Sequence, residues 1–238
     1  ALGEGRLYGK DVATLAAAGD TTLPEEQLNP VHRLWRPTPD RTGMLGEAGR
    51  TFLVDRVTTP DGPSFVVNAL AEDAGLLPDR VADALTLESA TRVEGVAAFN
   101  DVMAERYLPA FDRVADRIAE VSPAVVESYA DIALPVAGID FDAVAVVGPT
   151  RARIYDGSRY CKACEVASGS ASEGQLEERV DRVVGMIEPV STHTLEPLDG
   201  EARADPHRVA DAYADVYEAL LAVVFGESES DDPAANSV

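Results

Sequence analysis

The chain has 238 residues with 42 acidic and 20 basic side chains, which give a formal net charge of -22 and an isoelectric point near 4.3. This length suits one larger domain that needs no disulfide or metal to fold, and the longest apolar run, residues 219–225, is too short to span a membrane. A surface this acidic repels phosphate backbones and anionic lipid headgroups, so we expect no nucleic acid and no membrane among its partners.

The types of charged residue point to the solvent in which the protein works. Only Lys10 and Lys162 among the 20 basic residues are lysine, and the apolar content comes largely from small side chains. Excess carboxylate with scarce lysine is typical of salt-accumulating halophiles, because molar salt shortens the Debye length to about 3 Å and screens self-repulsion. The N-terminus has neither the basic start nor the apolar stretch of a signal peptide, so we expect a soluble, halophilic, cytoplasmic protein.

The first fifty residues mix one regular element with a long irregular one. Residues 10–18 have the pattern of a short helix that ends at Gly19. Residues 27–50 show no periodicity and contain several prolines, the only tryptophan and several arginines. We expect an ordered but irregular loop there.

A β-hairpin should follow. Residues 51–57 and 64–70 are rich in β-forming side chains, and the Thr-Thr-Pro-Asp-Gly-Pro segment between them is a strong turn signal. Residues 1–70 are therefore expected to form an irregular N-terminal part that carries one hairpin.

The middle of the chain changes from helical to strand-like patterns. Residues 78–121 are expected to be mainly helical, with Pro109 at the start of a second helix. Residues 124–127 form a short apolar run that ends in Glu127, and residues 141–149 form a second run that Gly-Pro ends. Apolar runs without alternation fit strands that are covered on both faces, as in a parallel sheet.

The C-terminal third continues the alternation of helices and strands. The expected elements are a short strand at 151–155, a helix at 172–187, a strand at 190–195, a helix from Asp205 to Phe225, and a disordered acidic tail at 226–238.

This order predicts an α/β fold. We expect a three-layer domain with a mostly parallel sheet over residues 1–225, in which residues 71–225 supply the helices and parallel strands. No internal repeat or linker marks a second domain.

Glu127 is the first candidate for chemistry. Ligands in open parallel sheets bind beyond the carboxyl ends of the strands, and an acid at such an end can hold Mg²⁺ directly or through water. The competing interpretation is an ordinary surface acid at a strand end.

Two basic segments stand out from the acidic background. Residues 32–41 carry a net charge of +2 and include His32, Arg33 and Arg36, while residues 150–162 carry +3 and include Arg151 and Arg153. Guanidinium groups match phosphate and carboxylate oxygens, so these five residues are candidates for binding an anion. Equally, each arginine could pair with one of the 42 acids.

The two cysteines, Cys161 and Cys164, lie one helical turn apart. Structural zinc needs four ligands, and the three histidines show no ligand spacing relative to this pair. Packing inside a helix face is the simpler interpretation, and a redox or metal role is the alternative.

Four segments carry a resemblance to a known family. Residues 5–11 (Gly-Arg-Leu-Tyr-Gly-Lys-Asp), 29–37, 126–131 and 154–160 resemble haloarchaeal proteins that are predicted P-loop ATPases or GTPases and are similar in outline to dethiobiotin synthetase. The similarity covers about residues 3–225.

The resemblance implies a nucleotide-dependent activity. In those relatives a strand that ends in Glu supplies an acid of the Mg²⁺ site, which corresponds to Glu127, with Asp131 nearby. Mg²⁺ with ATP or GTP is the implied cofactor, and the activity would be that of a P-loop NTPase or an ATP-dependent ligase acting on an anionic small molecule. The Ser-Tyr-Ala-Asp that follows Glu127 departs from the glycines of dethiobiotin synthetase, so its substrate is not carried over.

The phosphate-binding loop of that family is not in this sequence. Residues 3–11 have glycines at the wrong spacing for a P-loop, and relatives carry a strand and P-loop before this segment. We therefore expect a P-loop-like fold without its first strand, and two hypotheses stay open. One is an enzyme with Glu127 and Asp131 as catalytic residues. The other is a non-catalytic binding or interaction domain. Under either hypothesis the chain could form a homodimer.

Overall fold

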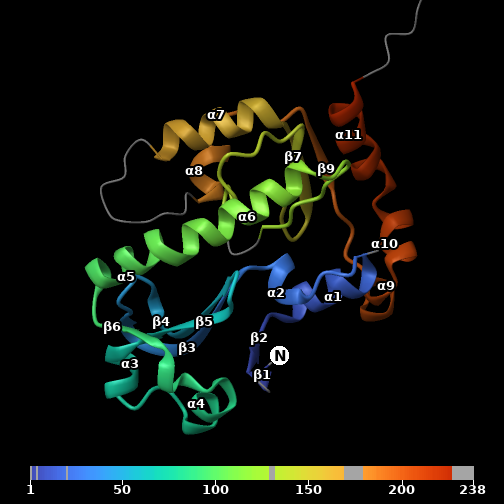
Figure 1. Ribbon diagram of the computed structural model, residues 1–238. Coiled ribbons are helices and arrows are strands. Elements are labelled where there is room, and N and C mark those ends of the chain that lie inside the picture. Colours follow the sequence, from blue (N-terminus) through green and yellow to red (C-terminus); the bar gives the residue numbers. More distant parts are fainter. Residues whose placement is uncertain (1, 4, 20, 129–131, 169–178, 227–238) are drawn as a thin grey trace, which may run out of the picture. The chain divides into compact units, whose positions relative to one another are not determined.

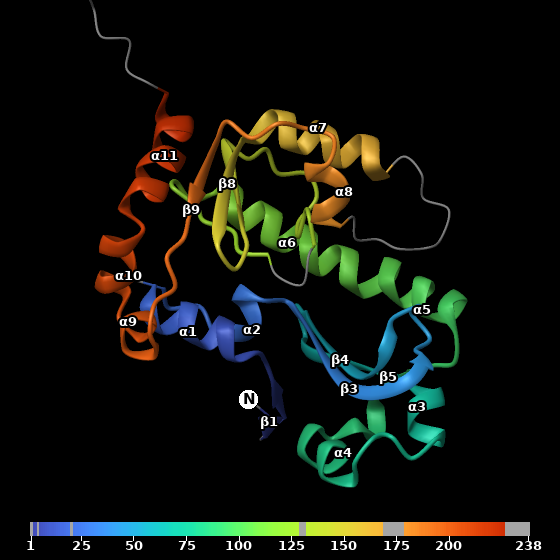
Figure 2. The same cartoon turned by 180° about the vertical axis from the view of Figure 1, so that it is seen from behind.

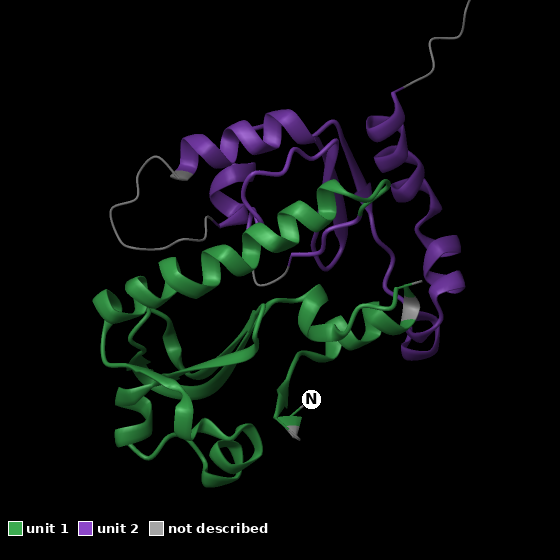
Figure 3. Cartoon of the chain, viewed as in Figure 1, with its two compact units in different colours: residues 1–124 green, residues 125–238 purple. Residues whose placement is uncertain are grey.

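The computed structural model describes residues 2–3, 5–19, 21–128, 132–168 and 179–226. Its chain forms two compact units, residues 1–124 and residues 125–238 (Figure 3). A compact unit is not in itself an independent domain, so the single domain expected over residues 1–225 stays a prediction. The acidic tail from residue 227 onward lies outside the described residues.

Unit 1 is built on a mixed four-stranded sheet with the order β3-β4-β5-β6 (Figure 1). Its elements are β1 (Leu2–Gly3), β2 (Arg6–Leu7), α1 (Lys10–Ala18), α2 (Glu25–Leu28), β3 (Val31–Thr42), β4 (Ala48–Thr59), β5 (Gly62–Asn68), α3 (Ala69–Asp73), α4 (Asp79–Leu85), a 3-10 turn (Leu87–Ser89), β6 (Thr91–Val93), α5 (Val96–Val102), a π-helical segment (Met103–Tyr107) and α6 (Leu108–Ala119).

Helices lie on both faces of this sheet (Figures 1 and 2). On one face, Phe52 and Val66 pack against Phe99 of α5 and Tyr107. On the other, the sheet packs against α3, α4 and the N-terminal segment, in a cluster of Leu7, Leu53, Val54, Val67, Ala71, Val81, Leu85 and Leu87. Two separate apolar layers explain why residues 51–57 of the central strand β4 are all buried.

The hairpin and the first helix are confirmed. Strands β4 and β5 pair antiparallel around a turn at Thr59–Gly62, where Gly62 has a φ of +119° that L side chains rarely adopt. Helix α1 covers the expected residues Lys10–Ala18.

The irregular loop expected over residues 27–50 is wrong, because β3 occupies Val31–Thr42. This strand is at the edge of the sheet and, among the described strands, pairs with β4 alone, so its prolines cost few ladder hydrogen bonds. A β-bulge also breaks the alternation: Leu34 lies opposite Val54 and Trp35 opposite Phe52, which leaves Leu53 as an extra residue.

Unit 2 contains a three-stranded antiparallel sheet with the order β7-β8-β9. Its elements are β7 (Ala143–Val147), β8 (Arg151–Asp156), α7 (Gly157–Ser168), α8 (Val180–Val184), β9 (Ser191–Thr194), α9 (Gly200–Ala204), α10 (Pro206–Ala212) and α11 (Ala214–Phe225). One buried cluster joins the sheet to α7 and α8 through Tyr155, Tyr160, Cys164 and Val183. Cys164 therefore packs in a core, as the simpler interpretation held.

Several expectations in the C-terminal third are confirmed. Strands β7, β8 and β9 lie within or close to the expected ranges, and the carboxylate of Asp205 accepts a hydrogen bond from the backbone N–H of His207 as a helix cap. The helix beyond it is interrupted at Tyr213. Of the helix expected over residues 172–187, residues 172–178 lie outside the described part, and within residues 179–187 only Val180–Val184 are helical, as α8.

The fold is α/β, but a mostly parallel sheet is not what the described strands form. Strands β5 and β6 pair in parallel, and every other described pairing of named strands is antiparallel. The reason is that helices on both faces produce unbroken apolar runs whichever way the strands run. In addition, the Gly-Pro turn after β7 is short enough to return the chain antiparallel.

No strand forms over residues 124–128, which were expected to run into Glu127. This segment has no regular secondary structure, and the side chain of Val125 is 97 % exposed. An apolar run becomes a strand only when a partner strand and a packing face are available, and the described residues provide neither for this one. The described helices also fall short of the length and apolarity that crossing a membrane requires.

Candidate functional site

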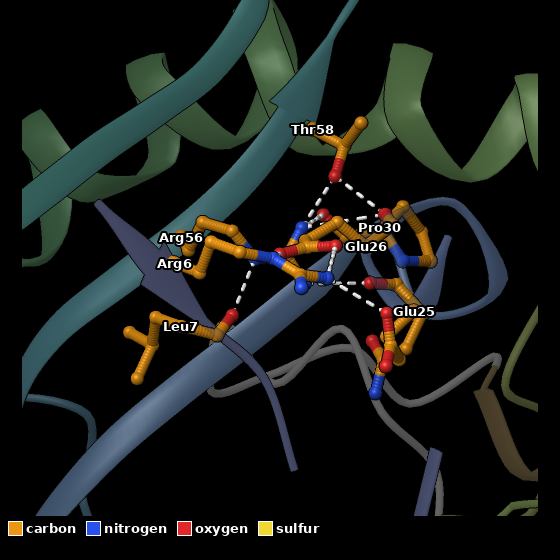
Figure 4. Close-up of polar contacts among 8 residues, drawn as sticks. Arg6, Leu7, Glu25, Glu26, Pro30, Arg56 and Thr58 are labelled. Atoms are coloured by element: carbon orange, nitrogen blue, oxygen red, sulfur yellow. Dashed lines mark hydrogen bonds and ion pairs between the residues drawn. The ribbon is translucent and has the colours of Figure 1, made fainter. Parts of the chain in front are cut away.

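Arg56 on β4 is a fully buried cation held by neutral oxygens (Figure 4). Its Nε donates to the Leu7 carbonyl at 2.7 Å and its Nη2 to the Asn29 carbonyl at 2.7 Å. Its Nη1 donates to the carbonyls of Glu26 and Pro30 and to the Thr58 hydroxyl. Within the described residues no carboxylate accepts a hydrogen bond from Arg56, and burial lowers the pKa of its guanidinium to about 10.

Arg6 lies beside this group and carries two carboxylates. Its Nε and Nη2 donate to the two oxygens of Glu26, each at 2.7 Å, and Nη2 also donates to Glu25 at 2.7 Å. Both glutamates are in the first turn of α2, which brings them to the Arg6 side of the sheet (Figure 4). Arg6 lowers the pKa of Glu26, and a backbone hydrogen bond followed by Arg6 lowers that of Glu25.

A cavity of about 350 Å³ opens next to these residues. It is lined by Gly5, Arg6, Pro24, Glu26, Gln27, Arg56, Thr58, Thr59, Pro60, Gly62 and Pro63. The charged residues of this lining are two arginines and one glutamate, and Glu25, which is outside the lining, also pairs with Arg6. The cavity therefore presents guanidinium groups that can bind an anion, within a cluster whose arginines and glutamates balance in charge.

A second buried polar cluster lies on the opposite face of the sheet. The carboxylate of Asp55, which is 0 % exposed, accepts from Arg33 Nε at 2.7 Å, from Arg33 Nη2 at 2.6 Å and from the Tyr107 hydroxyl at 2.6 Å. The Arg33 guanidinium also lies over the rings of Trp35 and Phe52, with its central carbon 5.3 Å and 4.9 Å from their centroids. Burial raises the pKa of Tyr107. This geometry makes Arg33 a structural residue.

His32 and Arg36 also make internal contacts. Burial and then the positive charge of Arg56 lower the pKa of His32, whose ring packs against Gly9. Arg36 donates from Nη1 to the Leu76 carbonyl at 2.6 Å. The structure therefore places His32 near the Arg56 cluster but engages Arg33 and Arg36 elsewhere.

The remaining expected site residues belong to unit 2. Glu127 is exposed and lies outside any strand, which corrects the expectation of an acid at a strand end. Asp131 lies outside the described residues. Arg151 is exposed at the start of β8, and Arg153 follows on the same strand.

A Mg²⁺ ion in a protein is held by carboxylates and other oxygen ligands that converge on one point. Over the described ranges, no three His, Cys, Asp or Glu side chains are grouped as metal ligands. Glu127 is thus not part of such a group, and we derive no step through a metal.

Sequence reasoning missed Arg6, Glu25, Glu26 and Arg56. One signal was present, because Asp55 and Arg56 interrupt the apolar run of residues 52–57 and must be buried if that strand is central. The pairing of Arg6 with Glu25 and Glu26 had no comparable signal.

Comparison of this chain with protein-family models, with curated proteins and with solved structures finds no match. The resemblance to P-loop proteins accordingly stays a hypothesis. The candidate site depends on the geometry of Arg6, Glu26, Arg56 and the cavity beside them.

Proposed function

We propose that unit 1 is a ligand-binding domain whose cavity beside Arg6 and Arg56 takes a small anionic molecule, and that the chain acts by binding it without turning it over. The observation that carries this proposal is Arg56, a buried cation that lines a cavity and whose hydrogen-bond acceptors among the described residues are all neutral, although the nearby Glu26 carboxylate also acts on its charge. Leaving a guanidinium in such a place is costly unless an anion can approach it.

The cavity suits a small ligand. Its volume of about 350 Å³ is near the lower end of the range for small-molecule sites, about 300–1,000 Å³. The prolines and glycines of the lining offer apolar and backbone surface, and the hydroxyls of Thr58 and Thr59 offer polar contacts.

Arg6 supplies an open donor edge. Its Nε and Nη2 are used by the two glutamates, but Nη1 has no hydrogen-bond partner among the described residues, and the side chain is 45 % exposed. A carboxylate or phosphate group could bind Nη1 while Glu26 keeps its contacts, because a guanidinium presents five N–H donors.

Binding is favoured over catalysis by the position of Glu127. The enzyme hypothesis needs this acid at a strand end facing a site, whereas Glu127 is exposed in a segment without regular structure. ATP and GTP, the nucleotides that the resemblance implies, remain the first ligands to try.

Calorimetric titration in molar KCl with ATP, GTP, AMP and inorganic phosphate tests the proposal. We expect saturable binding of at least one probe and at least about tenfold weaker binding by Arg6→Gln, which corresponds to about 1.4 kcal/mol. Arg92→Gln is the matched control, because Arg92 is 40 % exposed and also binds one glutamate, Glu72, with two nitrogens.

Equal weakening by both variants, or no binding of any probe to the folded chain, would overturn the proposal. Hydrolysis of Mg-ATP that disappears in Glu127→Gln would overturn its non-catalytic part.

A further inference from the structure

Two buried hydrogen-bond donors in unit 2 have no acceptor within the part of the chain that the structure describes. Arg153 and Tyr155 are two residues apart on β8, so their side chains leave the same face of the sheet. The Nε atom of Arg153 and the hydroxyl of Tyr155 are both buried, and neither has a hydrogen-bond partner among the described residues. Tyr155 is 1 % exposed.

Such atoms are rare in folded proteins, because an unsatisfied buried polar group loses its hydration without compensation. The buried tyrosine of unit 1 shows the usual solution, since the Tyr107 hydroxyl donates to Asp55 at 2.6 Å. Arg153 and Tyr155 are the exception, which indicates that a group outside the described residues accepts their hydrogen bonds.

Both groups act as donors. An arginine Nε–H cannot accept a hydrogen bond. Burial raises the pKa of Tyr155, so its hydroxyl keeps its proton at neutral pH and is available to donate. Two donors on one face of a strand suit a ligand group with two oxygens.

The residues around Arg153 and Tyr155 are mostly apolar and would compete little with a ligand for these two donors. On β7, the residues opposite Tyr155 and Arg153 are Val144 and Val146. From α7 and α8 the same cluster receives Tyr160, Ala163, Cys164 and Val183. The negative charge of Glu188, an exposed residue just before β9, also raises the pKa of Tyr155.

We propose that Arg153 and Tyr155 form a binding site for one oxyanion group, a carboxylate or a phosphate of a small ligand. The site belongs to unit 2 and is independent of the cavity in unit 1. Arg153 was a candidate from charge alone, and Tyr155 is the second donor that the structure adds.

The test is an NMR titration of the full chain in which the Nε–H resonance of Arg153 is followed at constant KCl. Acetate and inorganic phosphate are titrated separately, so that the response to each identifies the preferred group. We expect a saturable shift of Arg153, and binding about tenfold weaker in Tyr155→Phe. Tyr213→Phe should bind as the wild type does, because the Tyr213 hydroxyl already donates to the Glu196 carbonyl at 2.8 Å.

Two further measurements guard against simpler explanations. Glu188→Gln should bind the anion more tightly, because a like charge is removed. If Glu188 is instead the native acceptor, this variant shifts Arg153 without any ligand, and the proposal fails.

Tyr155→Phe without added anion should keep the urea midpoint of the wild type. A lower midpoint would show that the hydroxyl is already satisfied, for example by an ordered water, and would overturn the proposal. Absence of any saturable shift with either anion would do the same.

Discussion

Asp55→Asn should be among the most damaging single substitutions in unit 1. The carboxylate is fully buried and accepts three hydrogen bonds, two from Arg33 and one from Tyr107. Asparagine keeps one oxygen and places an amide donor against N–H or O–H donors. It also leaves the Arg33 charge without its counter-ion over the ring of Phe52. Removing one partner of a buried ion pair costs about 3–5 kcal/mol, so we expect a loss of that size.

Urea unfolding in molar KCl, followed by circular dichroism, measures this loss. The matched control is Glu72→Gln, which breaks a pair of similar geometry at the surface, where Arg92 and Glu72 are 40 % and 32 % exposed. The control should cost less than about 1 kcal/mol. Similar losses for the two variants, with unchanged slopes against urea, would refute the argument that burial makes the Asp55 cluster important.

Three further predictions concern neighbouring features. The folded state lowers the pKa of His32 below its ordinary value of 6.5, so the unfolded chain binds a proton more readily. The free energy of unfolding should therefore fall as the pH drops below 6.5. His32→Gln should reduce the dependence of that free energy on pH, as measured by urea unfolding at several pH values. Arg56→Lys should cost at least about 2 kcal/mol in urea unfolding, because an ammonium group cannot reach all the carbonyls that the guanidinium satisfies. Gly157→Ala would place a Cβ atom 1.7 Å from the Phe141 carbonyl oxygen at the start of α7, so thermal unfolding should show a lower midpoint or lose cooperativity, and an unchanged midpoint would contradict the close approach.

The parts of the fold that sequence predicted are those with local causes. The hairpin turn before Gly62, the end of α1 at Gly19 and the cap at Asp205 each depend on a few consecutive residues. Residue type alone carries that information, since φ preferences and capping side chains act within one turn.

Strand pairing beyond the β4–β5 hairpin is not set by a few consecutive residues, and there the predictions failed. Whether β3 is a strand depends on β4, which returns to it beyond a turn, and edge position makes its prolines acceptable. The run before Glu127 has strand-forming residues but no partner strand among the described residues, and it is irregular. A residue pattern shows that a segment can form a strand. It does not show whether the fold places a second strand beside it.

The same distinction governs the arginines. Arg33 and Arg36 belong to a basic segment, yet their acceptors are Asp55 and the Leu76 carbonyl, 22 and 40 residues away. Local net charge cannot detect such partners, so it marks structural and ligand-binding arginines alike. A buried guanidinium whose described hydrogen-bond acceptors are all neutral is the more selective sign of an anion site, because burial has removed water and carbonyl oxygens supply only partial charge in its place. By that criterion the sites to examine are those at Arg56, which sequence did not single out, and at the buried Nε of Arg153, which it did.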